Sequence, residues 1–88
     1  MGSLPEDGVR DVITTAVRDH ESQLVSYAFS ILGDRDRARD AAQDSFLKLH
    51  RECQQNGPPR LVKPWLFAVC RNRCVDWLRR GGKVQLVD

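Results

Sequence analysis

Apolar residues recur every three to four positions in three successive stretches of the chain, a spacing typical of amphipathic helices. The stretches run from about Val9 to Leu32, from about Arg35 to Gln54 and from Lys63 to Arg80. The middle of the first stretch, residues 18–22, is polar, so a kink there or a division into two shorter helices stays open. No alternation of period two is long enough to predict a strand. We therefore expect an all-α fold, a compact bundle of three to four helices.

Residues that end or start helices separate the three stretches. Gly33 is expected to end the first helix, and Asp34 to cap the second. Pro64 fits the first turn of the third helix, where its missing N–H is not needed. The run Asn56-Gly57-Pro58-Pro59 predicts a loop, and the apolar residues 61–62 after it are expected to pack back onto the core.

The third stretch, KPWLFAVCRNRCVDWLRR, combines an apolar stripe with a basic surface. The stripe consists of Leu66, Phe67, Val69, Cys70, Cys74 and Leu78. The remaining surface carries Arg71, Arg73, Arg79 and Arg80, with Asn72 and Asp76 one helical turn apart. A helix that buries one side and shows arginines beside an amide can hold phosphates and read a base.

Several of these side chains also have a purely structural interpretation. Trp65 and Phe67 are expected in the core, whereas Trp77 falls off the stripe, so a core position and partial exposure both stay open for it. Asp76 could touch DNA, but an intrahelical ion pair with Arg79 or Arg80 is the favoured interpretation, because these residues lie three and four positions away. Orienting Asn72 is a second structural role for Asp76.

Charge is distributed unevenly along the 88 residues. Residues 1–59 carry 7 Lys/Arg and 10 Asp/Glu, a balance of −3, whereas residues 60–83 carry 7 Lys/Arg and Asp76 alone, a balance of +6. Asp88 brings the total to +2. A basic C-terminal third on an acidic body indicates a local site for a polyanion. A solvated helix face is the alternative interpretation of the same charges.

Composition narrows the class of protein. Hydrophobic content of 41% and charged content of 30% are ordinary for one small soluble globular domain. No apolar run approaches the roughly 20 residues of a membrane span, and the start lacks a basic and then apolar signal, so a cytoplasmic location without membrane contact is expected. There is no Gly-rich phosphate loop, no paired nucleophile and base, and no partner that would make a dyad with His20 or His50. We therefore expect a protein that is not an enzyme.

The odd number of three cysteines, without a secretion signal, argues against a disulfide framework. Cys70 and Cys74 lie one turn apart on the apolar stripe, so buried thiols are the default. A zinc site from His50, Cys53, Cys70 and Cys74 on facing helices is the less favoured alternative, because structural zinc sites usually place a short loop within at least one ligand pair. We expect no metal and no cofactor.

Two motifs in order give the chain a family resemblance. The helix ARDAAQDSF at residues 38–46 is followed by WLFAVCRNRCVDWLRR at residues 65–80, with ILGD at residues 31–34 before them. Together they resemble region 2 of the extracytoplasmic-function (ECF) sigma factors, the small bacterial members of the sigma-70 family. The resemblance covers roughly residues 9–83. Either motif alone would be weak evidence; their order and separation make the combination specific.

The resemblance implies that the second helix docks on the coiled-coil clamp helices of the β′ subunit of RNA polymerase core. The residues that carry this role over are Asp40, Gln43, Asp44 and Phe46, with Phe46 supporting the surface from the core. The family often has Glu where this chain has Arg39, so this charge reversal is expected to weaken or re-tune docking.

The resemblance also implies that the third helix and the loop before it bind and melt the −10 promoter element and capture a base of the non-template strand. Asn72 is then the residue that reads the base, and the backbone contacts are Arg71, Arg73, Arg79 and Arg80. The loop Asn56–Lys63, with Arg60, would form a wall of the base pocket. A flipped base loses stacking worth a few kcal/mol, so a pocket must pair its edge.

The family pattern also predicts the organisation of the chain. Residues 1–8 are expected to be a tail, residues 9–83 the helical domain and residues 84–88 the start of an interdomain linker. The family has a second, helix-turn-helix domain that reads the −35 element, so we expect this chain to be an excised domain. An anti-sigma factor is a further implied partner.

Outside the family, the alternative function is that of a helical protein-interaction module, zinc-stabilised or metal-free, that regulates a partner. Double-stranded DNA binding through a helix-turn-helix is a weaker hypothesis, because no short-turn helix pair precedes the basic helix.

Overall fold

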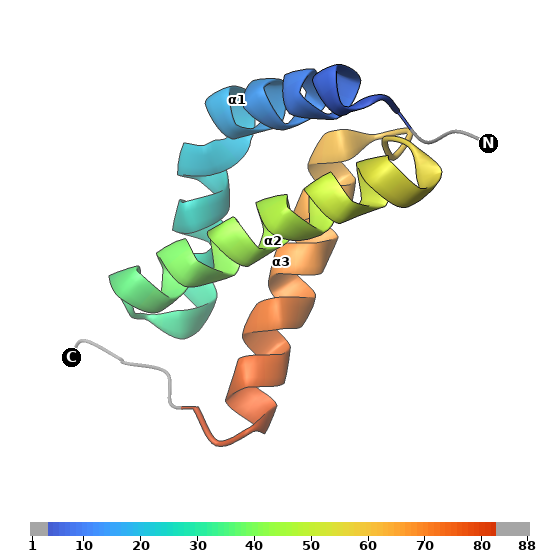
Figure 1. Ribbon diagram of the computed structural model, residues 1–88. Helices are drawn as coiled ribbons and strands as arrows, with labels where there is room; N and C mark the ends of the chain where they lie inside the picture. Colours follow the sequence, from blue (N-terminus) through green and yellow to red (C-terminus); the bar gives the residue numbers. More distant parts are fainter. Residues whose placement is uncertain (1–3, 83–88) are drawn as a thin grey trace.

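A computed structural model describes residues 4–82 and shows three helices packed against one another (Figure 1). Helix α1 spans Glu6–Leu32, α2 spans Arg35–Asn56 and α3 spans Val62–Arg79. The described residues contain no strand. The all-α bundle predicted from the apolar spacing is therefore confirmed, with three helices.

Helix α1 begins three residues before the predicted start. Pro5 takes the N-cap position, and Glu6 and Asp7 place negative charge in the first turn, where the helix dipole favours it. Glu6 also contacts the end of α2, since its carboxylate accepts from Gln54 at 3.4 Å and lies 3.6 Å from His50 Nε2. These contacts stabilise a first helical turn that carries no apolar residue. Hydrophobic periodicity therefore could not predict this turn.

The polar middle of α1 does not divide the helix. The 27 residues are helical throughout, but Figure 1 shows the helix axis turning at its middle, so the N-terminal half lies along one side of α2 and the C-terminal half crosses its start. Of the two predicted alternatives, the kink is therefore correct. The buried side chains of both halves are Val9, Ala16, Leu24, Ala28 and Leu32.

The turn between α1 and α2 has the predicted caps. Gly33 adopts the left-handed conformation, φ 70°, and its N–H donates to the carbonyl of Phe29 at 2.8 Å. Glycine is favoured there because a Cβ would be strained at positive φ. The carboxylate of Asp34 accepts from the backbone N–H of Arg37 at 3.1 Å, which satisfies one free donor of α2.

Helix α2 buries small residues in its first half and large ones in its second. Its buried residues are Ala38, Ala41, Ala42, Ser45, Phe46, Leu49 and Cys53. The small side chains let both other helices approach closely. The fully buried hydroxyl of Ser45 donates to the carbonyl of Ala41 at 2.8 Å, so this polar group in the core is satisfied.

The connection between α2 and α3 differs from prediction at both of its ends. Asn56 was expected in the loop but is the last residue of α2, where its side-chain amide donates to Glu52 at 3.3 Å. Leu61 was expected to pack onto the core, but 65% of its surface is exposed, while Val62 is partly buried against the core. Leu61 is the N-cap of α3, and at that position its side chain remains in solvent.

Helix α3 places three residues of the predicted stripe, Leu66, Cys70 and Cys74, in the core with no exposed surface. The other stripe residues, Phe67, Val69 and Leu78, are partly buried. Phe67 packs its ring against that of Tyr27 from α1, with centroids 5.2 Å apart. The predicted core residue Trp65 is likewise partly buried and packs against the core.

Candidate functional site

Helices α2 and α3 form an open groove of about 400 Å³ with a mostly basic lining. The lining residues are Lys48 from α2 and Arg71, Asn72, Arg73, Val75, Asp76 and Arg79 from α3. Four of them are cationic and one is anionic. A volume of this size is within the range of ligand sites, and the charge balance favours an anion. The structure therefore brings together five of the residues predicted from sequence to contact DNA.

Arg73 is held inside this groove by a residue of the other helix. Its Nε donates to Oδ2 of Asp44 at 2.7 Å, with the two side chains 38% and 40% exposed. This hydrogen bond raises the pKa of Arg73, an effect that partial burial opposes. The predicted polymerase contact Asp44 and the predicted phosphate contact Arg73 are thus each other's partners in the described structure.

The intrahelical partner predicted for Asp76 is present. Arg80 Nε lies 3.2 Å from Asp76 Oδ2, one helical turn away. Asn72 is exposed, and among the described residues its amide donates no hydrogen bond to Asp76. The amide of Asn72 therefore points to solvent with its donors and acceptor available, while Asp76 reduces the positive charge of Arg80.

Three further predicted DNA contacts, Asn56, Arg60 and Lys63, lie at or near the connection between α2 and α3. Arg60 is exposed in the loop, and Lys63 is exposed in the first turn with its ammonium group 5.9 Å from the centroid of the Phe67 ring. Neither these residues nor Asn56 lines the groove that holds Asn72. The loop before α3 and the groove beside α3 are thus two separate basic areas.

The outward side of α2 presents the residues predicted to bind polymerase. Asp40 and Gln43 are exposed, and Phe46 is buried beneath this surface, as expected. Leu47, one turn after Gln43, exposes 65% of its surface. Arg39 is exposed too, and it lines a polar groove against α1 together with Gln43.

Leu47 borders an apolar groove of about 310 Å³ between α1 and α2. The groove is lined by Ile13, Val17, Glu21, Gln43, Phe46, Leu47 and His50. Gln43 therefore adjoins both the apolar and the polar groove along the α1 and α2 seam. An exposed leucine beside an amide and a carboxylate is a combination found where one protein binds another.

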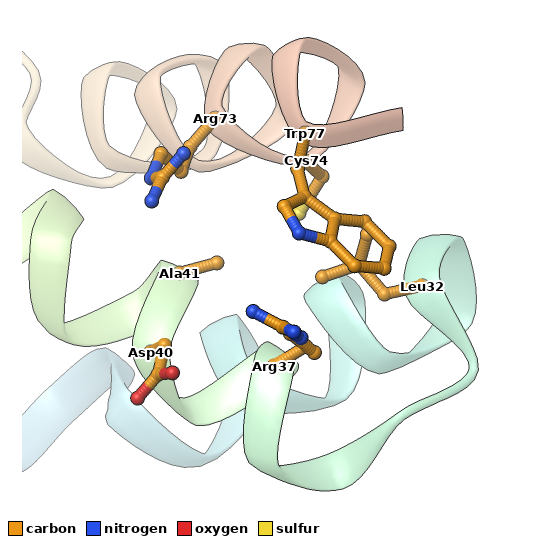
Figure 2. Close-up of a pocket in the computed structure, with 7 residues that line it drawn as sticks. All are labelled: Leu32, Arg37, Asp40, Ala41, Arg73, Cys74 and Trp77. Atoms are coloured by element: carbon orange, nitrogen blue, oxygen red, sulfur yellow. The ribbon is translucent and has the colours of Figure 1, made fainter. Parts of the chain in front are cut away.

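A small cavity of about 40 Å³ lies where α2 starts and α3 ends (Figure 2). Figure 2 shows the guanidinium of Arg37 directed at the indole of Trp77, and its central carbon lies 4.9 Å from the ring centroid. The same view shows the carboxylate of Asp40 pointing away from Trp77. The cavity is far smaller than a ligand pocket, so it is a packing feature. Trp77 is partly buried, so of the two positions left open for it partial exposure is correct, and its side chain joins the two helix ends.

The cysteines do not assemble a metal centre. Cys53, Cys70 and Cys74 are buried free thiols, and within residues 4–82 no three His, Cys, Asp or Glu side chains are grouped to hold a metal ion. Burial and the nearby charge of Glu52 raise the pKa of the Cys53 thiol. The zinc alternative therefore has no set of ligands in this part of the chain.

Two residues of α2 that line these grooves were not predicted from the sequence. Lys48 was not among the predicted DNA contacts, yet it lines the α3 groove, because residue 48 lies one turn beyond Asp44 on the flank that faces α3. Leu47 was not singled out, since an isolated leucine next to a buried stripe resembles part of that stripe. Its position one residue after Phe46 was the available signal.

Comparison with known proteins adds a family to this geometry. Residues 16–84 match the family described as Sigma-70 region 2. Among curated relatives, the RNA polymerase sigma factor SigV of Bacillus subtilis (strain 168) is 26% identical over 77 residues, which are 88% of this chain and 46% of SigV. No solved structure matches the chain.

Two further relatives carry the ECF description. The ECF RNA polymerase sigma factor SigE of Mycolicibacterium smegmatis is 29% identical over 70 residues, 80% of this chain and 27% of SigE. The ECF RNA polymerase sigma factor EcfG of Rhodopseudomonas palustris is 31% identical over 83 residues, 93% of this chain and 44% of EcfG. The chain thus spans less than half the length of each of these three relatives. No helix among the described residues has the length and apolar character to cross a membrane.

Proposed function

The chain belongs to the sigma-70 family through its region 2, and from that premise we propose that it serves transcription initiation by joining RNA polymerase core to the −10 element of a promoter. Docking uses the outward side of α2, and DNA binding uses α3. The protein acts in the bacterial cytoplasm with no catalytic step of its own. An anti-sigma factor is a further candidate partner.

One observation carries this proposal: the exposed members of the two predicted contact sets lie on adjacent helices and face different directions, while Asp44 lies between the two sets in its pair with Arg73. The predicted residues Asp40 and Gln43, with Leu47 beside them, are exposed on the outward side of α2. Asn72 lines the groove beside α3 together with Arg71 and Arg79. A factor that bridges polymerase and DNA needs two surfaces that can be occupied together. The arrangement of this domain meets that requirement.

The docking surface combines charge with an exposed apolar group. Asp40 and Gln43 can pair with donors of the β′ clamp helices, and Leu47 can bury its exposed surface against them, a gain of about 25 cal/mol for each Å² removed from water. The Arg39 beside Asp40 adds a positive charge that would disfavour a basic partner surface and favour an acidic one. We infer that Arg39 tunes the affinity of docking.

The DNA surface separates affinity from sequence selection. Arg71 and Arg79 are exposed in the groove and neutralise phosphates, which contributes affinity to any strand. Asn72 lies between them with a free amide, the group that can pair with the edge of a base. Because its side chain is not tied to Asp76, it can turn toward a base that leaves the stack.

The test of this division is the base preference of polymerase core assembled with the chain. A single-stranded library randomised across the −10 region is selected with the unmodified chain and with the Asn72→Ala variant. Selection should lose its preference at one position in the variant, while capture of non-specific strands stays nearly unchanged. An equal loss of capture for all sequences would contradict the assignment of Asn72 to base reading.

A matched variant tests the role of the arginines. The double replacement Arg79→Ala with Arg80→Ala should weaken the binding of every sequence together and make binding less dependent on salt. Base preference should remain. An unchanged salt dependence would exclude these two residues as phosphate contacts.

A further inference from the structure

The groove beside α3 receives a cation from α2 as well. Lys48 is exposed and lines the groove together with Arg73, which is half-exposed and comes from the opposite wall. A lysine ammonium group and an arginine guanidinium group on the two walls of one groove can both reach an anion that lies between them. A phosphate diester carries its charge on oxygens that accept from both groups.

Arg73 already has an anionic partner on α2, next to the residues that line this groove. The carboxylate of Asp44 accepts from its Nε at 2.7 Å, a short charge-assisted hydrogen bond. Asp44 lies one helical turn before Lys48, so its carboxylate neighbours on α2 the ammonium group that lines the groove. A strand that enters the groove therefore meets Lys48, which has no ion-pair partner among residues 4–82, and Arg73, which is paired with Asp44.

We propose that the groove between α2 and α3 binds a backbone phosphate of single-stranded DNA between Lys48 and Arg73, and that Asp44 competes with this phosphate for Arg73. The nucleic-acid surface is then built by two helices instead of one. The identity of the strand as promoter DNA rests on the proposed function, whereas the phosphate site does not depend on which bases are read.

The competition gives Asp44 a defined effect. In the free domain Asp44 neutralises part of the charge of Arg73 and repels an incoming phosphate, so it lowers the affinity for DNA. A polymerase group that binds Asp44 would release Arg73 to the strand. The same carboxylate would then connect docking on one side of α2 to DNA binding on the other.

Fluorescence anisotropy of labelled oligo(dT) with the purified 88-residue chain, over a series of salt concentrations, tests the Lys48 part. Lys48→Gln should weaken binding about two- to five-fold at low salt and reduce the slope of log affinity against log salt by about 0.7, the value for one phosphate on a single strand. Arg51→Gln, an equal loss of charge one turn along α2 and outside the groove, should keep the slope of the unmodified chain. Equal slopes for Lys48→Gln and the unmodified chain would overturn the proposal.

The competition is tested in the same assay by releasing Arg73. Asp44→Asn should raise the affinity about two- to five-fold, and the gain should disappear when Arg73→Gln is added. Asp19→Asn removes a carboxylate that is paired with Arg18 on α1, so it controls for net charge and should give a smaller gain that persists with Arg73→Gln. A gain from Asp44→Asn that is independent of Arg73, or no gain, would refute the competition. Failure of a folded chain to bind oligo(dT) at low salt would also overturn it.

These outcomes separate this proposal from the proposed function. Oligo(dT) tests phosphate contacts only, so loss of base preference or of polymerase docking leaves the result unchanged. Conversely, a chain that docks on polymerase and selects a −10 sequence, but shows no effect of Lys48→Gln, would retain the proposed function and lose the two-helix phosphate site.

Discussion

Arg73 donates a 2.7 Å hydrogen bond from its Nε to Oδ2 of Asp44, and this bond links the middle of α3 to the middle of α2. The two residues are 29 positions apart in the chain. Each had been assigned to a different surface by the family resemblance. Their contact means that the proposed polymerase surface and the proposed DNA surface share one ion pair.

The ion pair should contribute modestly to stability. A double-mutant cycle with Asp44→Ala and Arg73→Ala should give a coupling free energy of about 0.5–1 kcal/mol, since both side chains are partly exposed to screening solvent. The Asp76 and Arg80 pair is the matched control, because it is longer, 3.2 Å, and more exposed. Its cycle should give a smaller coupling. Urea unfolding measures both, and a larger coupling for the control would contradict the ranking.

The core should depend strongly on the buried leucine of α3. Leu66→Ala leaves a cavity at a position with no exposed surface and should lower the free energy of unfolding by about 2–5 kcal/mol. Leu61→Ala makes the same chemical change five residues earlier, where the side chain is 65% exposed. It should change the free energy of unfolding by less than about 0.5 kcal/mol. Chemical unfolding of the two variants checks this. Similar losses in both would show that Leu61 is buried in solution.

Stability should fall in mildly alkaline solution because of Cys53. Burial raises the pKa of this thiol, so it stays protonated in the folded chain while it ionises in the unfolded chain. The contribution is fully present below the unfolded pKa and is lost as pH rises above about 8.5, by up to about 1.4 kcal/mol per pH unit. Cys53→Ala should make the decline shallower between about pH 8 and 9.5.

The comparison in this experiment is between slopes and not between absolute stabilities, because Cys53→Ala also removes buried sulfur. Cys74 will retain part of the decline in the variant, since the neighbouring Cys70 thiol and burial raise its pKa too. An identical pH slope with and without Cys53 would show that its thiol is not desolvated in the folded chain.

Leu47 should matter for docking and not for folding. Leu47→Ala should change the free energy of unfolding by less than about 0.5 kcal/mol, because most of the side chain is already in water. The affinity of the Leu47→Ala variant for polymerase core should fall several-fold, because the proposed docking buries this leucine. Leu61→Ala, an equally exposed leucine at the start of α3, is the control and should bind polymerase core normally.

The sequence predicted most of the fold because its signals were local. Gly33 and Asp34 mark the turn between α1 and α2, and the small residues of α2 are read directly from its spacing. The wrong predictions concern residues whose positions depend on contacts between segments far apart in the sequence. Glu6 starts α1 early because it reaches the end of α2, and Leu61 stays exposed although it is apolar and adjoins the core.

The candidate site was predictable only within each helix. The spacing of Arg71, Asn72 and Asp76 placed them on one helix, and they do line one groove. Nothing in the sequence placed Lys48 in the same groove or paired Asp44 with Arg73, because those relationships depend on how α3 crosses α2. Periodicity defines the faces of a helix but does not say which neighbour each face meets.

The most direct test of the account is binding of this chain to the isolated β′ clamp helices. The unmodified chain is compared with the double variant Asp40→Ala and Gln43→Ala, and with Asp19→Ala and Gln23→Ala, which makes the same type of change on the exposed side of α1. Thermal unfolding of each confirms that it is folded. The account predicts binding by the unmodified chain and by the α1 variant, and its loss in the α2 variant. Absence of binding by the folded unmodified chain, or equal binding by all three, would contradict the proposed docking surface.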